Sequence, residues 1–560
     1  MKLKVIKILK KALDKEGIII KGIENLIEIP ANIEFGNYSF PCFILSKTLK
    51  KNPDKIAIDL KSKIELTKDF EKVEVVGAYI NFFVNKGEFA KKVVKEILNK
   101  KQDFGKGDNS KIMIEFSQAN SHKAFHVGHI RGTSIGESLS RISELFGNKV
   151  IRANYQGDTG MHVAKWLWCY SKYHSNEKLK KDEFWISSIY VDAIKRLDKN
   201  KRLQIEVEEI NRRLDLKIDK ELNKLWKKTR QLSLDSLERI YQELNTFFDI
   251  YYFESEVEQK GKEIAKELIE KEIAKISEGA TIVDLEEYNL GVWVLLRRDW
   301  TVLYSAKDLA LAKKKFEDND LDESVYVVAN EQDLHMKQLF KTLELMGFEN
   351  KNKLHHVTYG MVRLPEGKMS SRTGDNILYS NFIKEVTDYA KIRIRERAKK
   401  ISKKELEKRA LIVSIAAIKY SMLKQNPNKN IIFNKQDALN FEGDTGPYIL
   451  YSYVRANSIL KKAKIKKIKL DTSKLEEKEI ELVKKLSLFP EAVLKAHNNL
   501  NPSVIANYSY QLAQLFNEFY HSCPVIGSDQ EKFRLELVKA FKQVLKKSLD
   551  LLGIETLEEM

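Results

Sequence analysis

The sequence has few cysteines and no long apolar run, and each absence excludes a class of protein. Its 560 residues include only three cysteines, Cys42, Cys169 and Cys523, which lie far apart. Three separated thiols support neither a disulfide framework nor a zinc site, so we expect a protein of the reducing cytoplasm. No apolar run approaches the roughly 20 residues that a membrane-spanning helix needs. We therefore expect no membrane partner.

The first residues also lack the features of a targeting peptide. The segment MKLKVIKILKKALDKEG is basic and amphipathic, but it contains Asp14 and Glu16 and has neither arginine nor a small-residue cleavage site. We interpret it as the first helix of the fold. No internal repeat or low-complexity tract follows it.

Positive charge is in excess. The chain has 98 Lys and Arg against 80 Asp and Glu, which gives a formal net charge of +18. Such an excess favours a polyanionic partner such as RNA or an anionic membrane. A lysine-rich surface without functional meaning is the alternative explanation for part of it.

One segment predicts a phosphate site. Residues 111–116 alternate as a short buried strand does, a polar loop follows, and His126-Val127-Gly128-His129 then opens a helical pattern. The N-terminus of a helix binds phosphate, and a glycine there lets a flat ring approach the backbone. Two imidazoles three positions apart can donate hydrogen bonds to the same phosphate. A packed or metal-binding histidine pair is the alternative.

A second segment, 367–374, reads GKMSSRTG and follows Pro365. It predicts a small cationic loop that suits closure over a triphosphate, although a cationic surface turn has the same composition. The order HVGH and then KMSSR, more than 200 residues later, resembles the HIGH and KMSKS signatures of class I aminoacyl-tRNA synthetases.

Further segments narrow the resemblance to the arginyl-tRNA synthetase family. They are Asn120 with Lys123 and 126–131, then 154–158, 303–308 and 332–335, and near the C-terminus 441–460 and 506–526. The resemblance covers nearly the whole chain and is weakest from about 174 to 225.

The fold class that we expect is multidomain α/β. Strands at 112–116, 149–155, 281–284, 292–297 and 324–329 alternate with helices, which predicts a parallel sheet. The family implies a small N-terminal α/β domain at 1–105 that contacts the tRNA elbow. It further implies a Rossmann-like catalytic domain at 106–385 and an all-helical anticodon-binding domain at 386–560. A charged stretch at about 174–250 predicts a solvated helical insertion in the catalytic domain.

The resemblance implies an arginine–tRNA ligase, which makes arginyl-adenylate from L-arginine and ATP and transfers arginine to the 3′-terminal adenosine of tRNA(Arg). The implied catalytic residues are His126, His129, Lys123 and Lys368. The implied ATP-binding residues are His126, Gly128, His129, Lys368, Met369, Ser370, Ser371 and Arg372. The implied arginine-binding residues are Glu115, Asn120, Tyr304, Asp308 and Gln332. Mg²⁺ should arrive with ATP, and we expect no tightly bound metal, no editing domain and a monomer.

The chemistry of arginine supports the acidic positions. A guanidinium is always charged and presents a planar fork of donors, so it requires carboxylates. Tyr304 and Asp308 share one face if the segment is a helix. A surface salt bridge between Asp308 and Lys307 or another neighbour is the alternative.

The sequence departs from the family at three places. Ser371 stands where the general motif has lysine, and Lys123 stands where a lysine compensates in arginyl enzymes. Thr159 and His162 stand where the family usually has Trp and Gln, which leaves the contacts of that loop open. Three other functions are considered: a class I synthetase for another amino acid, a non-catalytic tRNA-binding paralogue, and a small-molecule nucleotidyltransferase with an HxGH motif. The acidic positions argue against the first, the intact signatures against the second, and the chain length against the third.

Overall fold

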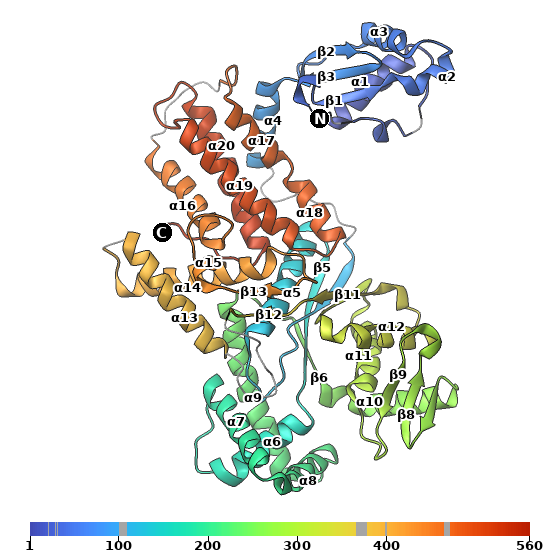
Figure 1. Ribbon diagram of the computed structural model, residues 1–560, viewed down its shortest axis with the longest axis vertical. Helices are drawn as coiled ribbons and strands as arrows, with labels where there is room; N and C mark the ends of the chain where they lie inside the picture. The colour runs from blue at the N-terminus through green and yellow to red at the C-terminus, as the bar shows by residue number, and fades with distance from the viewer. Residues whose placement is uncertain are drawn as a thin grey trace. The chain divides into compact units, whose positions relative to one another are not determined.

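The computed structural model describes residues 1–20, 22–28, 30, 32–99, 109–365, 378–397, 400–463 and 471–560 (Figure 1). The chain forms two compact units. One consists of Met1–Lys101, Ile459–Ser487 and Leu515–Gln543, and the other of Gln102–Ser458, Leu488–Gln514 and Val544–Met560.

The first unit contains a small antiparallel sheet in the order β1-β3-β2. Its strands are β1 (Tyr38–Pro41), β2 (Phe70–Val76) and β3 (Tyr79–Val84), and the helices beside them are α1 (Lys2–Asp14), α2 (Ser46–Leu49) and α3 (Pro53–Lys63). The apolar face of α1, including Val5 and Leu9, is buried in one core with Phe40 and Phe82 of the sheet. This is the small α/β fold expected near the N-terminus.

The same unit also contains α4 (Lys86–Asn99) and α17 (Glu477–Ser487), which pack together. A side chain at Gly87 of α4 would lie 2.5 Å from the carbonyl oxygen of Thr472, so the two segments approach at the backbone. Buried Glu479 of α17 accepts a hydrogen bond from Arg534 at 2.8 Å.

The second unit is built on a parallel sheet in the order β11-β10-β4-β5-β6. The strands are β4 (Lys111–Glu115), β5 (Lys149–Gln156), β6 (Ile250–Phe253), β10 (Glu323–Ala329) and β11 (Leu354–Tyr359). The chain moves from β4 to β5 and β6 on one side and then to β10 and β11 on the other. Ligands of such sheets bind at the carboxyl ends of the strands beside this change of direction, here β4 and β10.

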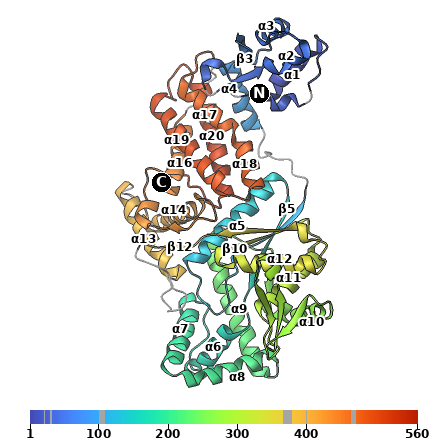
Figure 2. The ribbon, with the colours of Figure 1, turned by 45° about the vertical axis from the view of Figure 1, so that its right-hand side comes forward.

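Helix α5 (Val127–Phe146) connects β4 to β5 and packs on the sheet (Figure 2). Gly136 allows the close approach, because a Cβ there would lie 2.1 Å from Phe116. The other side of α5 packs against α14 (Lys403–Leu423) and α18 (Phe489–Asn498). The helix whose first residues form the predicted phosphate site is therefore held on both sides.

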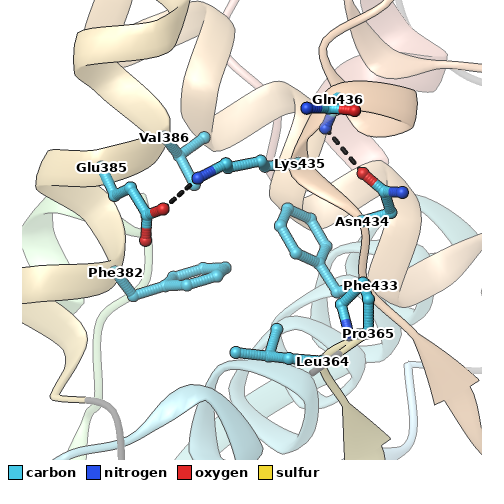
Figure 3. A pocket seen from close by; sticks show the side chains of 9 residues that line it. All are labelled: Leu364, Pro365, Phe382, Glu385, Val386, Phe433, Asn434, Lys435 and Gln436. Carbon is cyan, nitrogen blue, oxygen red and sulfur yellow. Dashed lines mark hydrogen bonds and ion pairs between the residues drawn. The ribbon is translucent and has the colours of Figure 1, made fainter. Parts of the chain in front are cut away.

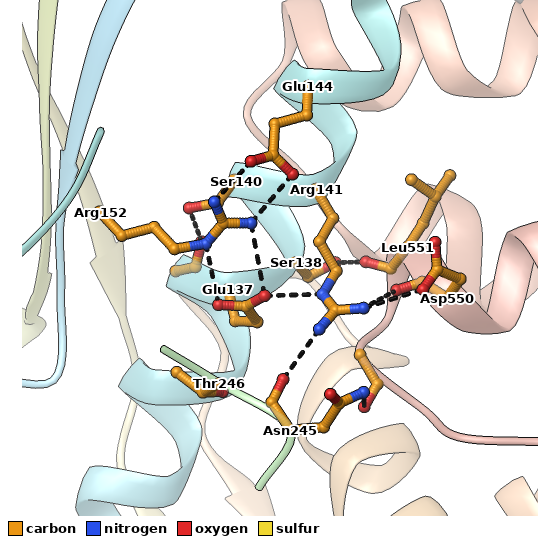
Figure 4. A network of polar contacts seen from close by, with 12 residues as sticks. Glu137, Ser138, Ser140, Arg141, Glu144, Arg152, Asn245, Thr246, Asp550 and Leu551 are labelled. Carbon is orange, nitrogen blue, oxygen red and sulfur yellow. Dashed lines mark hydrogen bonds and ion pairs between the residues drawn. The ribbon is translucent and has the colours of Figure 1, made fainter. Parts of the chain in front are cut away.

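Buried ion pairs fix α5 further (Figure 4). Glu137, fully buried, pairs with Arg141 at 2.6 Å and with Arg152 of β5 at 3.1 Å. Arg141 also donates to the side chain of Asp550 at 2.9 Å and to the carbonyl oxygen of Asn245 at 2.9 Å. The network joins α5 to its sheet and to the C-terminal end of the chain.

A second, antiparallel sheet in this unit corrects one prediction. Segments 281–284 and 292–297 were expected in the parallel sheet, but they form β8 (Ala280–Asp284) and β9 (Val292–Leu296) of an antiparallel sheet in the order β7-β8-β9, in which β8 pairs with both β7 (Ala274–Ser277) and β9. The short connection from β8 to β9 suits a hairpin, whereas a parallel pair needs a crossover of a dozen or more residues. The helices α10 (Glu254–Glu270), α11 (Tyr304–Asn319) and α12 (Asp333–Leu345) belong to the same region.

A group of helices occupies 161–243. It consists of α6 (Met161–Cys169), a π-helical turn (Tyr170–His174), α7 (Glu183–Lys199), α8 (Gln204–Asp215) and α9 (Lys220–Glu243), gathered together in both ribbon views. Four tryptophans, Trp166, Trp168, Trp185 and Trp226, lie in its core.

The C-terminal part of the chain is helical, as expected, apart from the two-residue strand β13 (Ile431–Ile432), which pairs with β12 (Val362–Arg363). Its remaining helices are α13 (Tyr379–Arg397), α15 (Lys435–Ala438), α16 (Gly446–Lys462), α19 (Ser503–Ser522) and α20 (Glu531–Leu551). Short 3₁₀ turns lie at Ile23–Asn25, Ile33–Phe35, Cys42–Leu45, Lys201–Leu203, Glu286–Tyr288, Asn330–Gln332 and Lys351–Lys353. Among the described helices, none has both the length and the apolarity needed to cross a membrane.

Candidate active site

The two histidines of the first motif lie together at the start of α5. His126 is the residue before the helix, and its backbone N–H donates to Nδ1 of His129 at 3.1 Å. The two rings stack with their centroids 3.9 Å apart. Because Nδ1 of His129 accepts a hydrogen bond, the neutral ring carries its proton on Nε2. One N–H donor of His129 is therefore fixed by the local backbone.

Burial keeps both imidazoles neutral. It lowers the pKa of His126 to about 4 and that of His129 well below the usual value, and Lys123 acts in the same direction on both. Nδ1 of His126 is buried without a hydrogen-bond partner. At Gly128 an added Cβ would lie 3.0 and 3.1 Å from two atoms of the His126 ring. The pair therefore offers neutral donors, and a side chain at 128 would require the His126 ring to shift.

Positive charge beside the pair comes from Lys123. Its side chain is partly buried, and burial, followed by repulsion from Lys165, lowers its pKa. The residues predicted from the second motif, Lys368, Met369, Ser370, Ser371 and Arg372, lie outside the described residues.

The loop between β4 and α5 has an unusual backbone. Ser117, Gln118 and His122 have positive φ angles of 78°, 43° and 60°. Non-glycine residues in this region cost free energy and persist only where the surroundings hold them. Such outliers cluster at functional sites, which favours this loop as part of the site.

Helix α9 holds the loop in place. The N–H of His122 donates to Ser233 at 3.0 Å, and its Nε2 lies 2.8 Å from the hydroxyl of Thr229. Ser117 donates to the hydroxyl of Tyr241 at 3.1 Å. The inner face of α9, within the expected helical insertion, therefore supports this loop. The sequence signal for this contact was the pair of small polar side chains at 229 and 233, which share one helix face.

On the other side of the sheet's carboxyl edge, Asp308 of α11 bonds to a histidine. Its Oδ2 accepts from Nε2 of His335 at 2.7 Å, and Nδ1 of His335 accepts from the indole N–H of Trp293 at 3.3 Å. Tyr304, one helical turn before Asp308, is exposed and its ring lies 4.7 Å from that of His335. The structure thus brings the predicted Tyr304 and Asp308 together, as helical spacing requires.

Glu115, the second predicted carboxylate, already has a cation. At the end of β4 it forms an ion pair with Lys315 of α11, and both side chains are buried. Its Oε1 also accepts from Gln118 at 3.2 Å. The charge of Glu115 is therefore compensated within the protein, whereas Asp308 has an uncharged partner when His335 is neutral.

Tyr155, which the residue-level prediction missed, lies between the acidic groups. Its hydroxyl is buried without a hydrogen-bond partner. Burial raises the pKa of Tyr155 well above its usual value, and Asp308, Glu254 and Glu115 act in the same direction. A buried unpaired hydroxyl next to carboxylates is a candidate ligand contact.

Two of the three departures from the family, Thr159 and His162, have partners inside the protein. The hydroxyl of Thr159 bonds to Lys307 at 3.1 Å and to Glu254 at 3.3 Å, and Lys307 pairs with Glu254 at 2.9 Å. Lys307 is therefore not the partner of Asp308, so the alternative is wrong for Lys307, whereas a neighbour on α12, His335, does bond to Asp308. Nε2 of His162 lies 3.2 Å from the carbonyl oxygen of Gly157.

The last two predicted residues differ in their exposure. Asn120 is partly buried, and its Oδ1 would lie 2.1 Å from a Cβ at Gly157, so the side chain rests on that glycine. Gln332 is exposed in the turn before α12.

Among the described residues, Cys169, His174 and Asp192 have ligand atoms close enough together to hold a metal ion. Arg196 already donates to Oδ2 of Asp192 at 2.7 Å, and the two nitrogens of His174 lie 2.6 and 3.0 Å from Glu177 and Asp192. A metal ion would have to displace the guanidinium, so the group is explained as a polar network.

A pocket of about 220 Å³ lies elsewhere, between the end of β12, α13 and the start of α15 (Figure 3). Phe382 and Phe433 meet edge to face at 5.1 Å, and Glu385 pairs with Lys435 at the rim. None of the predicted site residues that the structure describes lines it. Its lining residues are Leu364, Pro365, Phe382, Glu385, Val386, Phe433, Asn434, Lys435 and Gln436.

Known families match almost the whole chain. The family model described as "tRNA synthetases class I (R), catalytic domain" matches residues 92–435. "DALR anticodon binding domain" matches 449–560, and "Arginyl tRNA synthetase N terminal domain" matches 3–84.

Relatives of similar length give the same result. The arginine–tRNA ligase of Clostridium acetobutylicum is 38% identical and that of Halothermothrix orenii is 37% identical, each over 97% of this chain and over 97% and 96% of their own. The solved arginyl-tRNA synthetase of Thermus thermophilus is 27% identical, with a TM-score of 0.79 and full coverage of both chains.

The parallel sheet and the helix that opens with the HxGH histidines fit a class I aminoacyl-tRNA synthetase, and the catalytic family model, which covers more than half of the chain, shows that class. Within that class, the chain belongs to the arginyl-tRNA synthetase family.

Proposed function

We propose that the start of α5 and the Asp308 region together form the site at which this chain, an arginine–tRNA ligase by its family, activates arginine. ATP phosphates bind at His126, Gly128 and His129, with positive charge from Lys123. Lys368, Met369, Ser370, Ser371 and Arg372 complete the phosphate site from the second motif. The observation that carries this proposal is the stacked, neutral histidine pair at a helix N-terminus.

The first step needs no protein nucleophile. A carboxylate oxygen of arginine attacks the α-phosphorus of ATP, the bond to the β-phosphate oxygen breaks, and pyrophosphate leaves with the electron pair. The N–H donors of His126 and His129 stabilise charge that develops on the phosphate oxygens. In the second step a hydroxyl of the terminal tRNA adenosine attacks the adenylate carbonyl, and AMP leaves. Catalysis consists mainly of positioning and charge stabilisation.

The guanidinium of arginine pairs with Asp308. This carboxylate is four-fifths buried, and its bonded neighbour is an imidazole and not a lysine or arginine. Its negative charge can therefore pair with the guanidinium. Tyr304 packs on the guanidinium plane, Glu115 stands behind as a second acidic group, and Asn120 and Gln332 hold the backbone of the amino acid. Tyr155, with its unpaired hydroxyl, joins this set.

The remaining partners follow from the family and from the charge. The class uses ATP, and we propose that Mg²⁺ enters bound to ATP. The anticodon-binding and N-terminal family matches support tRNA(Arg) as the partner. We further propose that the chain acts as a monomer in the cytoplasm, where its substrates are found.

The proposal is tested by charging bulk tRNA with each labelled amino acid in turn. Arginine alone should be transferred. Asp308→Asn should then lower kcat/KM for arginine by about 10²-fold or more, because a buried cation loses its charged partner. It should also narrow the gap between arginine and citrulline, which has a similar shape and no charge.

Asp318→Asn is the matched control. Asp318 lies on the same helix in an exposed ion pair with Lys314 at 2.9 Å, and its loss should change kcat/KM little. Normal arginine use by Asp308→Asn would remove Asp308 from the site.

A further inference from the structure

The hydrogen bonds of His335 form a directed chain that ends on the carboxylate of Asp308. The indole of Trp293 can only donate, and it donates to Nδ1 of His335 at 3.3 Å. With Nδ1 occupied as an acceptor, the proton of a neutral imidazole lies on Nε2, which donates to Oδ2 of Asp308 at 2.7 Å. Trp293 and His335 are buried, at 4% and 8% exposure.

This chain has two consequences for Asp308. It fixes the orientation of the carboxylate through Oδ2 and leaves Oδ1 available for a ligand. It also opposes a second proton on His335, because a proton at Nδ1 would require the indole N–H to leave. An imidazolium next to Asp308 would neutralise the carboxylate and repel a guanidinium.

We propose that Trp293 and His335 are positioning residues for arginine recognition, which hold Asp308 in place through a neutral imidazole and so leave its negative charge uncompensated for the guanidinium. The inference rests on the proposed function of Asp308 as the partner of the guanidinium. It assigns a role to the antiparallel sheet, since Trp293 lies on β9 and no other part of the chain bonds to Nδ1 of His335 among the described residues.

The groups around His335 support this assignment. From α11 it faces Asp308 and the ring of Tyr304, from β9 it faces Trp293, and from β11 it faces His356, whose pKa it helps to lower. Burial lowers the pKa of His356, so this second ring adds no positive charge at neutral pH. Asp308 is therefore the charged group that bonds to His335. The indole, by occupying Nδ1, keeps the charge of Asp308 available to a guanidinium.

The test compares the pH dependence of arginine use in Trp293→Phe and wild type. Phenylalanine fills most of the space but has no N–H, so Nδ1 becomes free to take a proton. Imidazoles ordinarily gain that proton between about pH 8 and 5. At pH 8.5 the KM for arginine should lie within about twofold of wild type, and at pH 6 it should be at least about fivefold higher. The kcat and the KM for ATP should follow the wild-type pH profile.

His335→Gln supplies the rescue. Its amide can donate to Asp308 but does not titrate, so the double variant Trp293→Phe/His335→Gln should lose the added pH dependence. Trp300→Phe is the matched control, because Trp300 is 47% exposed beyond the end of β9 and should behave as wild type. Melting curves of each variant at both pH values check folding.

The outcomes separate this inference from the proposed function. If Asp308→Asn raises the KM for arginine but Trp293→Phe follows the wild-type pH profile, the positioning role of Trp293 and His335 is wrong and the guanidinium site at Asp308 stands. If Trp293→Phe raises the KM equally at both pH values, the indole only packs, and the inference also fails. If Asp308→Asn has no effect, the proposed site itself is wrong.

Discussion

At the scale of single residues, the phosphate site works with neutral donors. Burial removes charge from His126 and His129, and the backbone of His126 fixes the proton of His129. Neutral N–H groups in a buried site stabilise developing charge without the cost of burying two further cations. Positive charge is left to lysines such as Lys123, which can keep contact with water.

Gly128 gives the first prediction at this scale. Gly128→Ala should lower the rate of arginine-dependent pyrophosphate exchange by about tenfold, because the new methyl group displaces the His126 ring and small misplacements of catalytic groups are costly. The same change should raise helix stability by roughly 0.5–1 kcal/mol, since alanine is the better helix former. Exchange kinetics and a melting curve on one preparation measure both effects.

An opposite response of activity and stability would exclude damage to the fold. Equal activity in Gly128→Ala and wild type would mean that the ring position of His126 is not limiting. A loss of both activity and stability would mean that the start of α5 rearranges, contrary to the packing described here.

The residue types at the site could be predicted from the sequence, but their partners could not. The HxGH pattern predicted His126 and His129, and helical spacing predicted that Tyr304 and Asp308 share a face. That Glu115 is paired with Lys315 and Asp308 with His335 depends on how α11 crosses β4 and α12, which no local pattern contains. Trp293 carried no signal at all, because a tryptophan in a strand is ordinarily a core residue.

At the scale of elements, long periodic segments were predicted well and short strands were not. The segments expected at 112–116, 149–155 and 324–329 are β4, β5 and β10 within one residue at each end. The strand β6 was missed because a run of four apolar residues also fits a buried helix, and β11 was missed because its sequence, LHHVTY, contains two histidines and a threonine in place of an apolar run. The prediction of the sheet to which β8 and β9 belong was wrong, since alternation along the chain does not reveal the partner of a strand.

Lys419 gives a prediction for the packing of α14 against α5. Its side chain is fully buried, and Nζ donates to the carbonyl oxygens of Leu244 at 2.5 Å and Gly553 at 3.1 Å. Burial lowers its pKa to about 7, although Glu137 acts in the opposite direction. Between this value and the unfolded pKa near 10.4, the unfolded chain holds a proton that the folded chain has released.

The free energy of unfolding should therefore rise with pH across that window. Below the window, the stability cost of burying Lys419 should be fully present. Lys419→Met removes the titrating group. The free energy of unfolding of wild type relative to Lys419→Met should increase between pH 7.5 and 9.5, by up to about 1.4 kcal/mol per pH unit. Urea unfolding of both proteins at both pH values measures the difference, in which all other titrating groups cancel.

Lys408→Met, an exposed change on the same helix, is the control and should show the same pH dependence as wild type. If the free energy of unfolding of Lys419→Met has the same pH dependence as that of wild type, the lysine keeps its charge in the folded protein. The carbonyl contacts together with Glu137 then compensate its burial.

At the scale of the whole molecule, composition and family point to the same partner. The chain carries a net charge of +18, and its three family matches include an anticodon-binding domain. A lysine-rich surface could have this charge without binding RNA, so the charge alone does not decide. What decides is whether cations of the protein replace counterions on the phosphates when tRNA binds.

The salt dependence of tRNA binding measures that replacement. For roughly five phosphate contacts, the affinity for tRNA(Arg) should fall by about 10²- to 10³-fold between 50 and 200 mM KCl, because each contact releases condensed counterions into solution. Filter binding or fluorescence anisotropy over this range gives the slope. Arginine affinity is the internal control and should change by less than about threefold, because a buried pair with Asp308 is screened weakly. If the affinity for tRNA stays constant over the same range, the positive surface takes no part in binding, and tRNA must be held by uncharged contacts instead.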